Sequence, residues 1–310
     1  MTDFIVYNSF VSKAEDSQGN YFRKHLGDRN FLVLGKASKI QTDYFNNNDG
    51  SYSLKYTCGG KEYYQFKNKL VATSFDRYLL TNPNSRYVSY INQEKNIDAI
   101  YVFFSSKEIK KLYTSLVLSE GELLDDPLGS REEFRFQETL YKLDSNINFL
   151  LSKLPNIVSQ TEFKEEMTSY LYSLMEQLVL NQEAVKQEQY KINATKKSTK
   201  EEVYKRLYIA KDYIDSCYDE NISVRELAKM AYMCEHHFLR RFKSFFKITP
   251  YQYLSKRRVE QAQELLLKNK DQTISSISLE LGFENVTSFN RCFKKHVQMS
   301  PSLYRVSKGF

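Results

Sequence analysis

Glycine, proline and cysteine are all scarce in this sequence of 310 residues, and it has no long apolar run. Only 5 prolines and 10 glycines argue against long disordered or collagen-like stretches. No apolar run approaches the ~18 residues of a transmembrane helix, and the sequence starts without the basic and apolar segments of a secretory signal. We therefore expect a cytoplasmic protein without membrane association, long enough for two domains of roughly 100–200 residues each.

Potential metal ligands are also scarce. The 4 cysteines include no Cys-x-x-Cys pair, which is typical of reduced thiols in the cytoplasm. The first 199 residues contain a single histidine, His25, which argues against a metal-dependent enzyme with clustered histidines. The pairs Cys234/His236 and Cys292/His296 lack zinc-finger spacing, so we expect no metal and no cofactor. No Ser-His-Asp set, phosphate loop or dinucleotide fingerprint stands out, and we expect no enzyme activity.

Charge is distributed unevenly along the chain. Residues 200–310 contain 20 lysines and arginines against 13 acidic residues, whereas residues 1–199 contain 25 of each kind. A neutral front and a basic back suggest that the back of the chain binds a polyanion such as nucleic acid. A solvated basic surface is the alternative on charge alone.

An internal repeat is present in the C-terminal third. Two copies indicate a tandem pair of small units, because a solenoid needs at least about three copies. Thr249 and Ser300 also precede the two prolines of the repeat at the same spacing. The identical pairs, each 51 residues apart, are Phe238/Phe289, Arg240/Arg291, Phe242/Phe293, Lys243/Lys294, Pro250/Pro301 and Tyr253/Tyr304.

Each copy has the capping signals of a helix, a turn and a second helix. In the first copy, Ser223-x-x-Glu226 is a capping box, and Cys234 occupies the N-cap of a helix predicted over 235–246. In the second copy, Thr273 caps a helix through Leu281, Gly282 follows its end, and Asn285 caps a helix predicted over 286–296. Thr249-Pro250 and Ser300-Pro301 begin the helices that follow each copy.

The second helix of each copy has one aromatic face and one polar face. At 100° per residue, Phe238, Phe242 and Phe245 share one face, and Phe289 and Phe293 share the equivalent face. The opposite faces carry a hydrogen-bonding residue, then an arginine, then a lysine. Arginine can bind the edge of guanine bidentately and lysine can bind phosphate, so the matched faces predict DNA recognition. The outward triplets are His236, Arg240 and Lys243, and Thr287, Arg291 and Lys294.

These residues resemble the DNA-binding domain of the AraC/XylS family of transcription regulators. The resemblance is carried by Val224 to Ala228, by Phe238 to Lys243, and above all by the run from Leu281 to Arg305, LGFENVTSFNRCFKKHVQMSPSLYR. It implies a seven-helix domain over residues 200–310, in which a long helix around Val259 joins two helix-turn-helix units that enter successive major grooves. The candidate DNA-binding residues are His236, Leu239, Arg240 and Lys243 in the first unit, and Val286, Thr287, Ser288, Asn290, Arg291 and Lys294 in the second.

Two positions depart from the pattern of the family. Cys234 replaces the usual serine, and Leu239 is apolar where polar base readers are common. Leu239 is therefore expected to contact a thymine methyl group or no base at all, and the second unit is expected to be anchored by Arg291.

The stretch from about 137 to 190 is predicted to be helical and amphipathic. Met167, Leu171, Leu174 and Leu178 recur at helical spacing and form a candidate dimer seam. The alternative is an amphipathic helix packed on its own domain. Many family members dimerise through helices in this position, which favours a homodimer. Residues 191–199, KINATKKST, lack apolar periodicity and are predicted to be the linker.

The front of the chain is predicted to be rich in β-structure. Apolar and polar side chains alternate from Tyr52 to Tyr56, which predicts a strand. Gly59-Gly60 is a two-residue turn, and Glu62 to Phe66 are predicted to form the second strand of a hairpin. Ile100 to Phe104 form another strand. Strand order resembles the cupin-like barrel of many AraC-type regulators, over about 1–120. The predicted fold class is therefore α+β with two domains: a cupin-like effector and dimerisation domain over 1–190 and an all-α domain over 200–310.

Three functions fit these features. The first is a ligand-responsive transcription regulator, more often an activator in this family, that binds promoter DNA, a small effector and RNA polymerase. The second is an enzyme or carrier tethered to DNA, against which the scarcity of histidine counts. The third is a constitutive DNA-binding regulator whose front domain binds only protein partners or dimerises. Neither the effector nor its residues can be read from the sequence.

Overall fold

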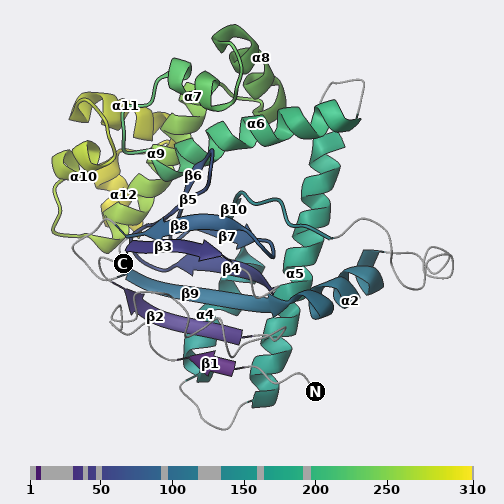
Figure 1. Ribbon diagram of the computed structural model, residues 1–310. Helices are drawn as coiled ribbons and strands as arrows, with labels where there is room; N and C mark the ends of the chain where they lie inside the picture. Colours follow the sequence, from purple (N-terminus) through teal and green to yellow (C-terminus); the bar gives the residue numbers. More distant parts are fainter. Residues whose placement is uncertain are drawn as a thin grey trace. The chain divides into compact units, whose positions relative to one another are not determined.

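A computed structural model describes residues 5–7, 31–37, 41–46, 51–91, 97–117, 134–158, 164–190 and 197–308 (Figure 1). The chain divides into two compact units, Met1–Tyr190 and Lys191–Phe310, which we call unit 1 and unit 2. Among the described residues, no helix is long and apolar enough to cross a membrane.

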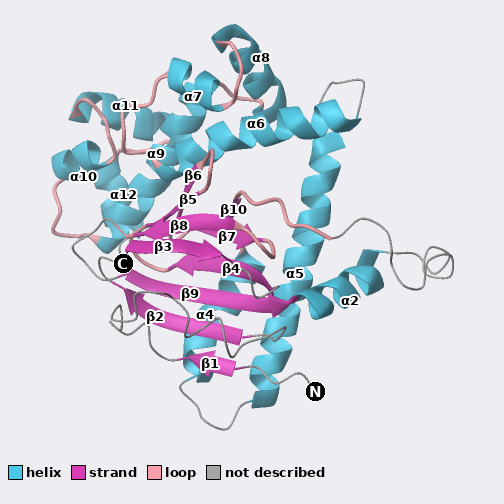
Figure 2. Ribbon diagram, in the orientation of Figure 1, coloured by secondary structure: helices cyan, strands magenta, loops and turns pink. Residues whose placement is uncertain are grey.

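Unit 1 contains two β-sheets and three described helices (Figure 2). The six-stranded sheet has the order β1 (Ile5–Tyr7), β2 (Phe31–Ala37), β9 (Ile97–Ser105), β4 (Ser51–Thr57), β7 (Arg77–Thr81) and β10 (Leu140–Lys142). The four-stranded sheet has the order β3 (Gln41–Asn46), β8 (Arg86–Tyr90), β5 (Glu62–Gln65) and β6 (Leu70–Thr73). Within the described residues, no strand pairing joins the two sheets into a closed barrel. The prediction of a β-rich front part is confirmed, and its cupin-like closure stays a prediction.

The predicted hairpin across Gly59-Gly60 is wrong. Both strands exist, but β4 pairs with β7 and β9, whereas β5 pairs with β6 and β8 in the other sheet. Gly60 has a positive φ of 81°, so a tight turn does occur there. That turn carries the chain from one sheet to the other, because the long pairing of β4 with β9 already occupies the ladder that a hairpin partner would need.

The helices of unit 1 cover the outer face of the six-stranded sheet. These helices are α2 (Ser106–Val117), α4 (Ser145–Val158) and α5 (Lys164–Tyr190). Alternate side chains of β4 and β9, including Leu54 and Val102, join side chains of all three helices in one apolar core. Since successive side chains of a strand point to opposite faces, the other half of each strand faces the four-stranded sheet.

The proposed dimer seam on α5 lies in this core. Met167 is 4% exposed, and Leu171, Leu174 and Leu178 are fully buried within a single chain. Side chains that are already covered inside their own unit cannot form a seam with a second copy. The structure therefore contradicts the predicted dimer seam and favours the alternative, an amphipathic helix packed on its own domain.

Unit 2 is helical throughout its described part. Its helices are α6 (Lys197–Ser216), α7 (Val224–Met230), α8 (Glu235–Phe246), α9 (Pro250–Lys268), α10 (Ile274–Glu280), α11 (Val286–Val297) and α12 (Pro301–Lys308). Helix α6 begins at Lys197, so the last three residues of the predicted linker, 197–199, are helical. The rest of the predicted linker, residues 191–196, lies outside the described residues.

Candidate nucleic-acid interface

The predicted caps position the two helix-turn-helix units. Ser223 and Glu226 form the capping box of α7, and the side chain of Thr273 accepts from the Ser276 amide at the start of α10. At the start of α11, the Asn285 side chain accepts from the Ser288 amide at 2.8 Å. Cys234 is the N-cap of α8 but makes no side-chain cap hydrogen bond, so α8 has the weaker start of the two.

The aromatic faces of α8 and α11 form equivalent cores. Phe238, Phe242, Phe289 and Phe293 are all 0% exposed. The ring of Phe242 lies 6.0 Å from that of Tyr253, and the ring of Phe293 lies 5.5 Å from that of Tyr304. The repeat of 51 residues is thus a repeat of contacts as well as of sequence.

Packing of the phenylalanines leaves the opposite faces of α8 and α11 in solvent. Leu239, the apolar residue among the candidates, is 38% exposed. Two of the candidates, Val286 and Ser288, are half-buried at the start of α11. The exposed candidates are His236, Leu239, Arg240 and Lys243 on α8, and Thr287, Asn290, Arg291 and Lys294 on α11. Eight of the ten candidates are therefore available to a ligand that reaches these helices from solvent.

The turns of the two units differ in one residue type and in length. Tyr232 and Gly282 occupy equivalent left-handed positions, with φ of 53° and 76°. Equivalent backbone bonds follow, from the Met233 amide to the Ala228 carbonyl and from the Phe283 amide to the Ser278 carbonyl. The second turn then has one additional residue, Glu284, so the first helices correspond at a spacing of 50 residues and the second helices at 51.

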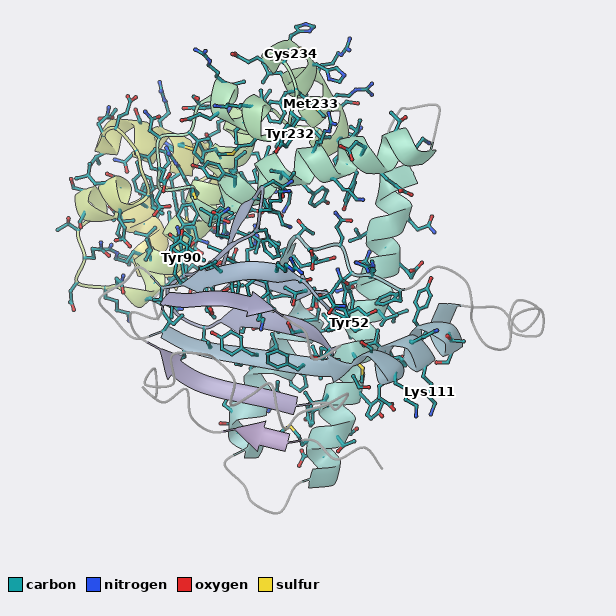
Figure 3. The ribbon with its side chains drawn as sticks, in the orientation of Figure 1. Tyr52, Tyr90, Lys111, Tyr232, Met233 and Cys234 are labelled. Carbon is teal, nitrogen blue, oxygen red and sulfur yellow. The ribbon has the colours of Figure 1, made fainter. Side chains whose placement is uncertain are left out.

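Beside the first turn lies a groove of about 470 Å³ that the sequence did not reveal. Figure 3 labels Tyr232, Met233 and Cys234 of the turn, which form one side of it. Arg206 of α6 also lines the groove and donates to the Tyr232 carbonyl at 3.3 Å. This contact holds α6 against the first unit. The groove is lined by Thr199, Glu202, Val203, Arg206, Tyr232, Met233, Cys234 and His237.

A buried ion network, also missed at the level of sequence, joins α6 to α9. The Asp215 carboxylate accepts from the Lys211 ammonium at 2.8 Å and from the Tyr253 hydroxyl at 3.0 Å. Arg257, 1% exposed, lies with its Nε 3.7 Å from the same carboxylate. Burial lowers the pKa of Lys211, but the charge of Asp215 opposes it strongly enough to raise the pKa overall. Charged residues in an amphipathic helix look like a solvated face, so no sequence signal marked them.

Cysteine and histidine side chains do not gather into a metal site in the part of the chain that the structure describes. No group of three or more metal-binding side chains is found there. His237, on the inner side of α8, instead accepts a hydrogen bond at Nε2 from Arg241 Nε at 3.2 Å. Burial, together with the charges of Arg241 and Arg240, lowers the pKa of His237.

His237 therefore makes the stability of unit 2 sensitive to mild acid. Because the folded pKa is lower than the unfolded value of about 6.5, the unfolded chain binds the proton first as the pH falls. The stabilisation is complete above the unfolded value and is lost as the pH falls from that value through the lower folded pKa. We expect the Tm of unit 2 to fall between pH 7.5 and 5.5, and His237→Gln to reduce this fall. Identical Tm profiles for both proteins would contradict the expectation.

Residues 227–307, from α7 to α12, match the protein family described as a helix-turn-helix domain. Unit 2 therefore contains a helix-turn-helix domain of the AraC type. The probable transcriptional regulator LumQ of Photobacterium leiognathi is 32% identical to it over 94 residues, which are 30% of this chain and 38% of LumQ. The lactose operon transcription activator of Staphylococcus xylosus is 32% identical over 96 residues, 31% of this chain and 34% of the activator.

Among solved structures, the DNA-binding domain of AdpA in complex with a target DNA is 30% identical to this chain. The likeness covers 33% of this chain and 91% of that one, with a TM-score of 0.32. The matches span little more than a third of the length of the two curated relatives.

Proposed function

We propose that the protein is a sequence-specific DNA-binding transcription regulator, in which α8 and α11 each read one segment of a major groove. The observation that carries the proposal is the pair of matched polar faces on two helices with matched aromatic cores. Arg240 and Arg291 occupy the same place on these faces, as do Lys243 and Lys294. The double match distinguishes the faces from an ordinary solvated surface, since chance would not repeat both the inner and the outer residues.

Recognition by the two helices differs in strength in this proposal. The second unit has the side-chain cap, the glycine turn and three polar residues next to Arg291, whereas α8 has no cap bond and exposes Leu239. Successive major grooves on one face of DNA are about 34 Å apart. If the two helices enter neighbouring grooves, bending of the DNA costs on the order of 1–6 kcal/mol, which the two sets of contacts must offset.

The remaining roles belong to the same proposal. Unit 1 binds a small-molecule effector in a cupin-like fold and forms a homodimer, and the regulator acts in the cytoplasm. Activation through contact with RNA polymerase is favoured over repression, because one relative is named a transcription activator. Since the α5 core residues are covered, the dimer surface must lie elsewhere on unit 1.

Truncation of Arg291 and truncation of Lys294 are expected to weaken DNA binding in different ways. Arg291→Ala should cost ~1–3 kcal/mol of binding free energy and relax specificity at one base position, because a bidentate base contact is lost. Lys294→Ala should weaken binding about equally to all sequences and lower the salt dependence by about one phosphate contact. Gel-shift titrations on genomic fragments and on point-mutated sites would measure both effects.

Lys268→Ala is the matched control for these variants. Lys268 is an exposed lysine on α9 that pairs with Glu264 at 2.6 Å, and its removal changes the net charge by the same amount. It should leave specific affinity close to that of the unchanged protein. The proposed function would be contradicted if no fragment bound at least ~10³-fold better than bulk DNA. Sequence-independent losses of equal size for Arg291→Ala and Lys294→Ala would contradict base reading by Arg291.

A further inference from the structure

The end of α6, the middle of α9 and the turn before α11 meet at one place in unit 2. Helix α6 packs against α7 and α8 of the first helix-turn-helix unit, and α9 packs against α10 and α11 of the second. The second turn approaches the end of α6 so closely that a Cβ at Gly282 would overlap the Asp219 carbonyl. We call this place the joint. It consists of Tyr218, Asp219, Glu220, Arg258, Gly282 and Phe283.

Arg258 of α9 contacts the other two parts of the joint. Its Nε donates to the Tyr218 carbonyl at 2.7 Å, and its Nη2 donates to the Glu220 carbonyl at 2.8 Å, just beyond the end of α6. Its Cζ lies 5.3 Å from the centroid of the Phe283 ring, in the turn before α11. A single side chain therefore joins the end of α6, the connecting helix and the turn of the second helix-turn-helix unit.

A guanidinium group suits the joint for a geometric reason. Its N–H groups diverge within one plane, so they reach two carbonyl oxygens at once while the flat face remains free for an aromatic ring. An ammonium group carries the same charge but is a compact point with no flat face to stack. Lysine at position 258 would therefore keep the charge and lose the combination of contacts.

The hydrogen bonds of the corresponding arginine in the first helix-turn-helix unit stay within that unit. Arg206 of α6 lies beside the left-handed Tyr232, as Arg258 lies beside the left-handed Gly282. Arg206 donates to the Tyr232 carbonyl at 3.3 Å and to the Glu202 carboxylate at 2.7 Å. The two arginines share a place in the repeat, but of the two it is Arg258 that connects one unit to the other.

The buried ion network does not perform the same task. Its four side chains, on Lys211, Asp215, Tyr253 and Arg257, all lie on α6 or α9. The network therefore fixes α6 to α9, whereas the turn of the second helix-turn-helix unit is attached to the end of α6 through Arg258.

A fixed orientation matters for a protein that reads DNA with two helices. Once α8 is in its groove, a fixed joint presents α11 already aligned with the next segment, so little conformational freedom is lost when it binds. Linking two modules in a geometry that matches their sites raises affinity by about 10²–10⁴-fold over that of either module alone. A joint that pivots spreads α11 over many orientations and loses part of this gain.

We propose that Arg258 is the positioning residue that fixes α11 relative to α8, so that the two recognition helices bind DNA as one preorganised surface. In this assignment Arg258 touches no DNA. It acts through the carbonyls at the end of α6 and through the turn that contains Gly282 and Phe283. The inference rests on the proposed function, because it concerns how the two DNA-reading helices of that proposal are held.

The test compares one complete DNA site with two half-sites. The complete site is a genomic fragment that the unchanged chain binds specifically, and footprinting locates its two bound segments. Each half-site is the same fragment with the bases of one bound segment scrambled. Gel-shift titrations with the full chain, at one salt concentration and well below the Tm of each variant, give the affinity for all three DNAs.

Arg258→Lys is expected to weaken binding to the complete site by about tenfold or more and to leave binding to both half-sites within about twofold. Each helix-turn-helix unit is intact in this variant, and the loss is confined to their joint action. A merely destabilising substitution would instead lower all three affinities by the same factor, because it reduces the amount of folded protein. If Arg258→Lys does not fold, Arg258→Gln, which keeps an amide donor, carries the same test.

Arg206→Lys is the matched control. It is the same change at the corresponding arginine, whose hydrogen bonds stay within the first helix-turn-helix unit. It should weaken the complete site no more than it weakens the half-site that keeps the segment bound by α8. A loss confined to the complete site in Arg206→Lys, equal to that in Arg258→Lys, would overturn the assignment of the joint to Arg258.

The two levels of the proposal fail in different ways. If the unchanged chain binds no fragment specifically, the proposed function fails and the role of Arg258 fails with it. If the unchanged chain binds specifically, but Arg258→Lys weakens the complete site no more than the half-sites, the role of Arg258 fails alone.

Discussion

Replacing Asp215 with alanine is expected to lower the free energy of unfolding of unit 2 by about 3–5 kcal/mol, because the buried Arg257 and the half-buried Lys211 would lose their shared partner. The Asp215 carboxylate is fully buried between α6 and α9, where Lys211, Tyr253 and Arg257 converge on it. Removal of the carboxylate leaves Lys211 and Arg257 charged and covered. Urea denaturation of the full chain, followed by the helical circular dichroism signal, would measure the loss.

An exposed ion pair on the same helix provides the control for Asp215. Glu202 and Arg206 of α6 pair at 2.7 Å with side chains that are 55% and 36% exposed. Glu202→Ala should change the free energy of unfolding by at most about 0.5 kcal/mol, because solvent-exposed pairs of this spacing contribute little. Equal effects of Asp215→Ala and Glu202→Ala would show that the buried network does not connect α6 to α9 in the way described.

Gly282→Ala is expected to destabilise unit 2 by about 3 kcal/mol and to abolish specific DNA binding with it. A Cβ at Gly282 would lie 2.3 Å from the backbone oxygen of Asp219 and 2.9 Å from an Nη of Arg258. Arg258 has little freedom to move, because it donates to the Tyr218 carbonyl at 2.7 Å and to the Glu220 carbonyl at 2.8 Å. Left-handed strain of about 1–2 kcal/mol adds to the overlap.

The equivalent turn of the first unit supplies a matched control for Gly282. Tyr232 adopts the same left-handed conformation but is 63% exposed, so its side chain meets no such obstacle. Tyr232→Gly should change the free energy of unfolding by no more than about 1 kcal/mol, since relief of strain and added chain entropy oppose each other. Thermal denaturation of both variants would test the pair, and a harmless Gly282→Ala would refute the steric argument.

Local signals predicted the candidate interface well. Ser223, Thr249, Thr273 and Asn285 act as caps where the sequence placed them, because capping depends on a few neighbouring residues. The buried phenylalanines and exposed arginines of α8 and α11 follow from helical periodicity alone.

Non-local partners were the part that the sequence did not reveal. The alternation in β4 and β5 predicted two strands but could not say that each would find its partners in a different sheet. The spacing of Leu171 and Leu178 predicted a helix with an apolar face, but the same spacing serves a dimer and an internal core equally. Asp215 and Arg257 lie 42 residues apart, and nothing local to either marks their contact.

If α8 and α11 both read DNA as proposed, the continuous helix α9 limits the kind of operator that the protein can bind. With 19 residues and a rise of 1.5 Å per residue, it is roughly 28 Å long, and it joins the two helix-turn-helix units without a flexible segment. Two DNA-binding units joined by a flexible linker tolerate recognition segments at variable spacing, whereas two units joined by a continuous helix do not. An extra base pair between the two recognised segments would shift the second by about 3.4 Å and turn it about the DNA axis. Binding-site variants of this protein should therefore differ in their bases and keep one length.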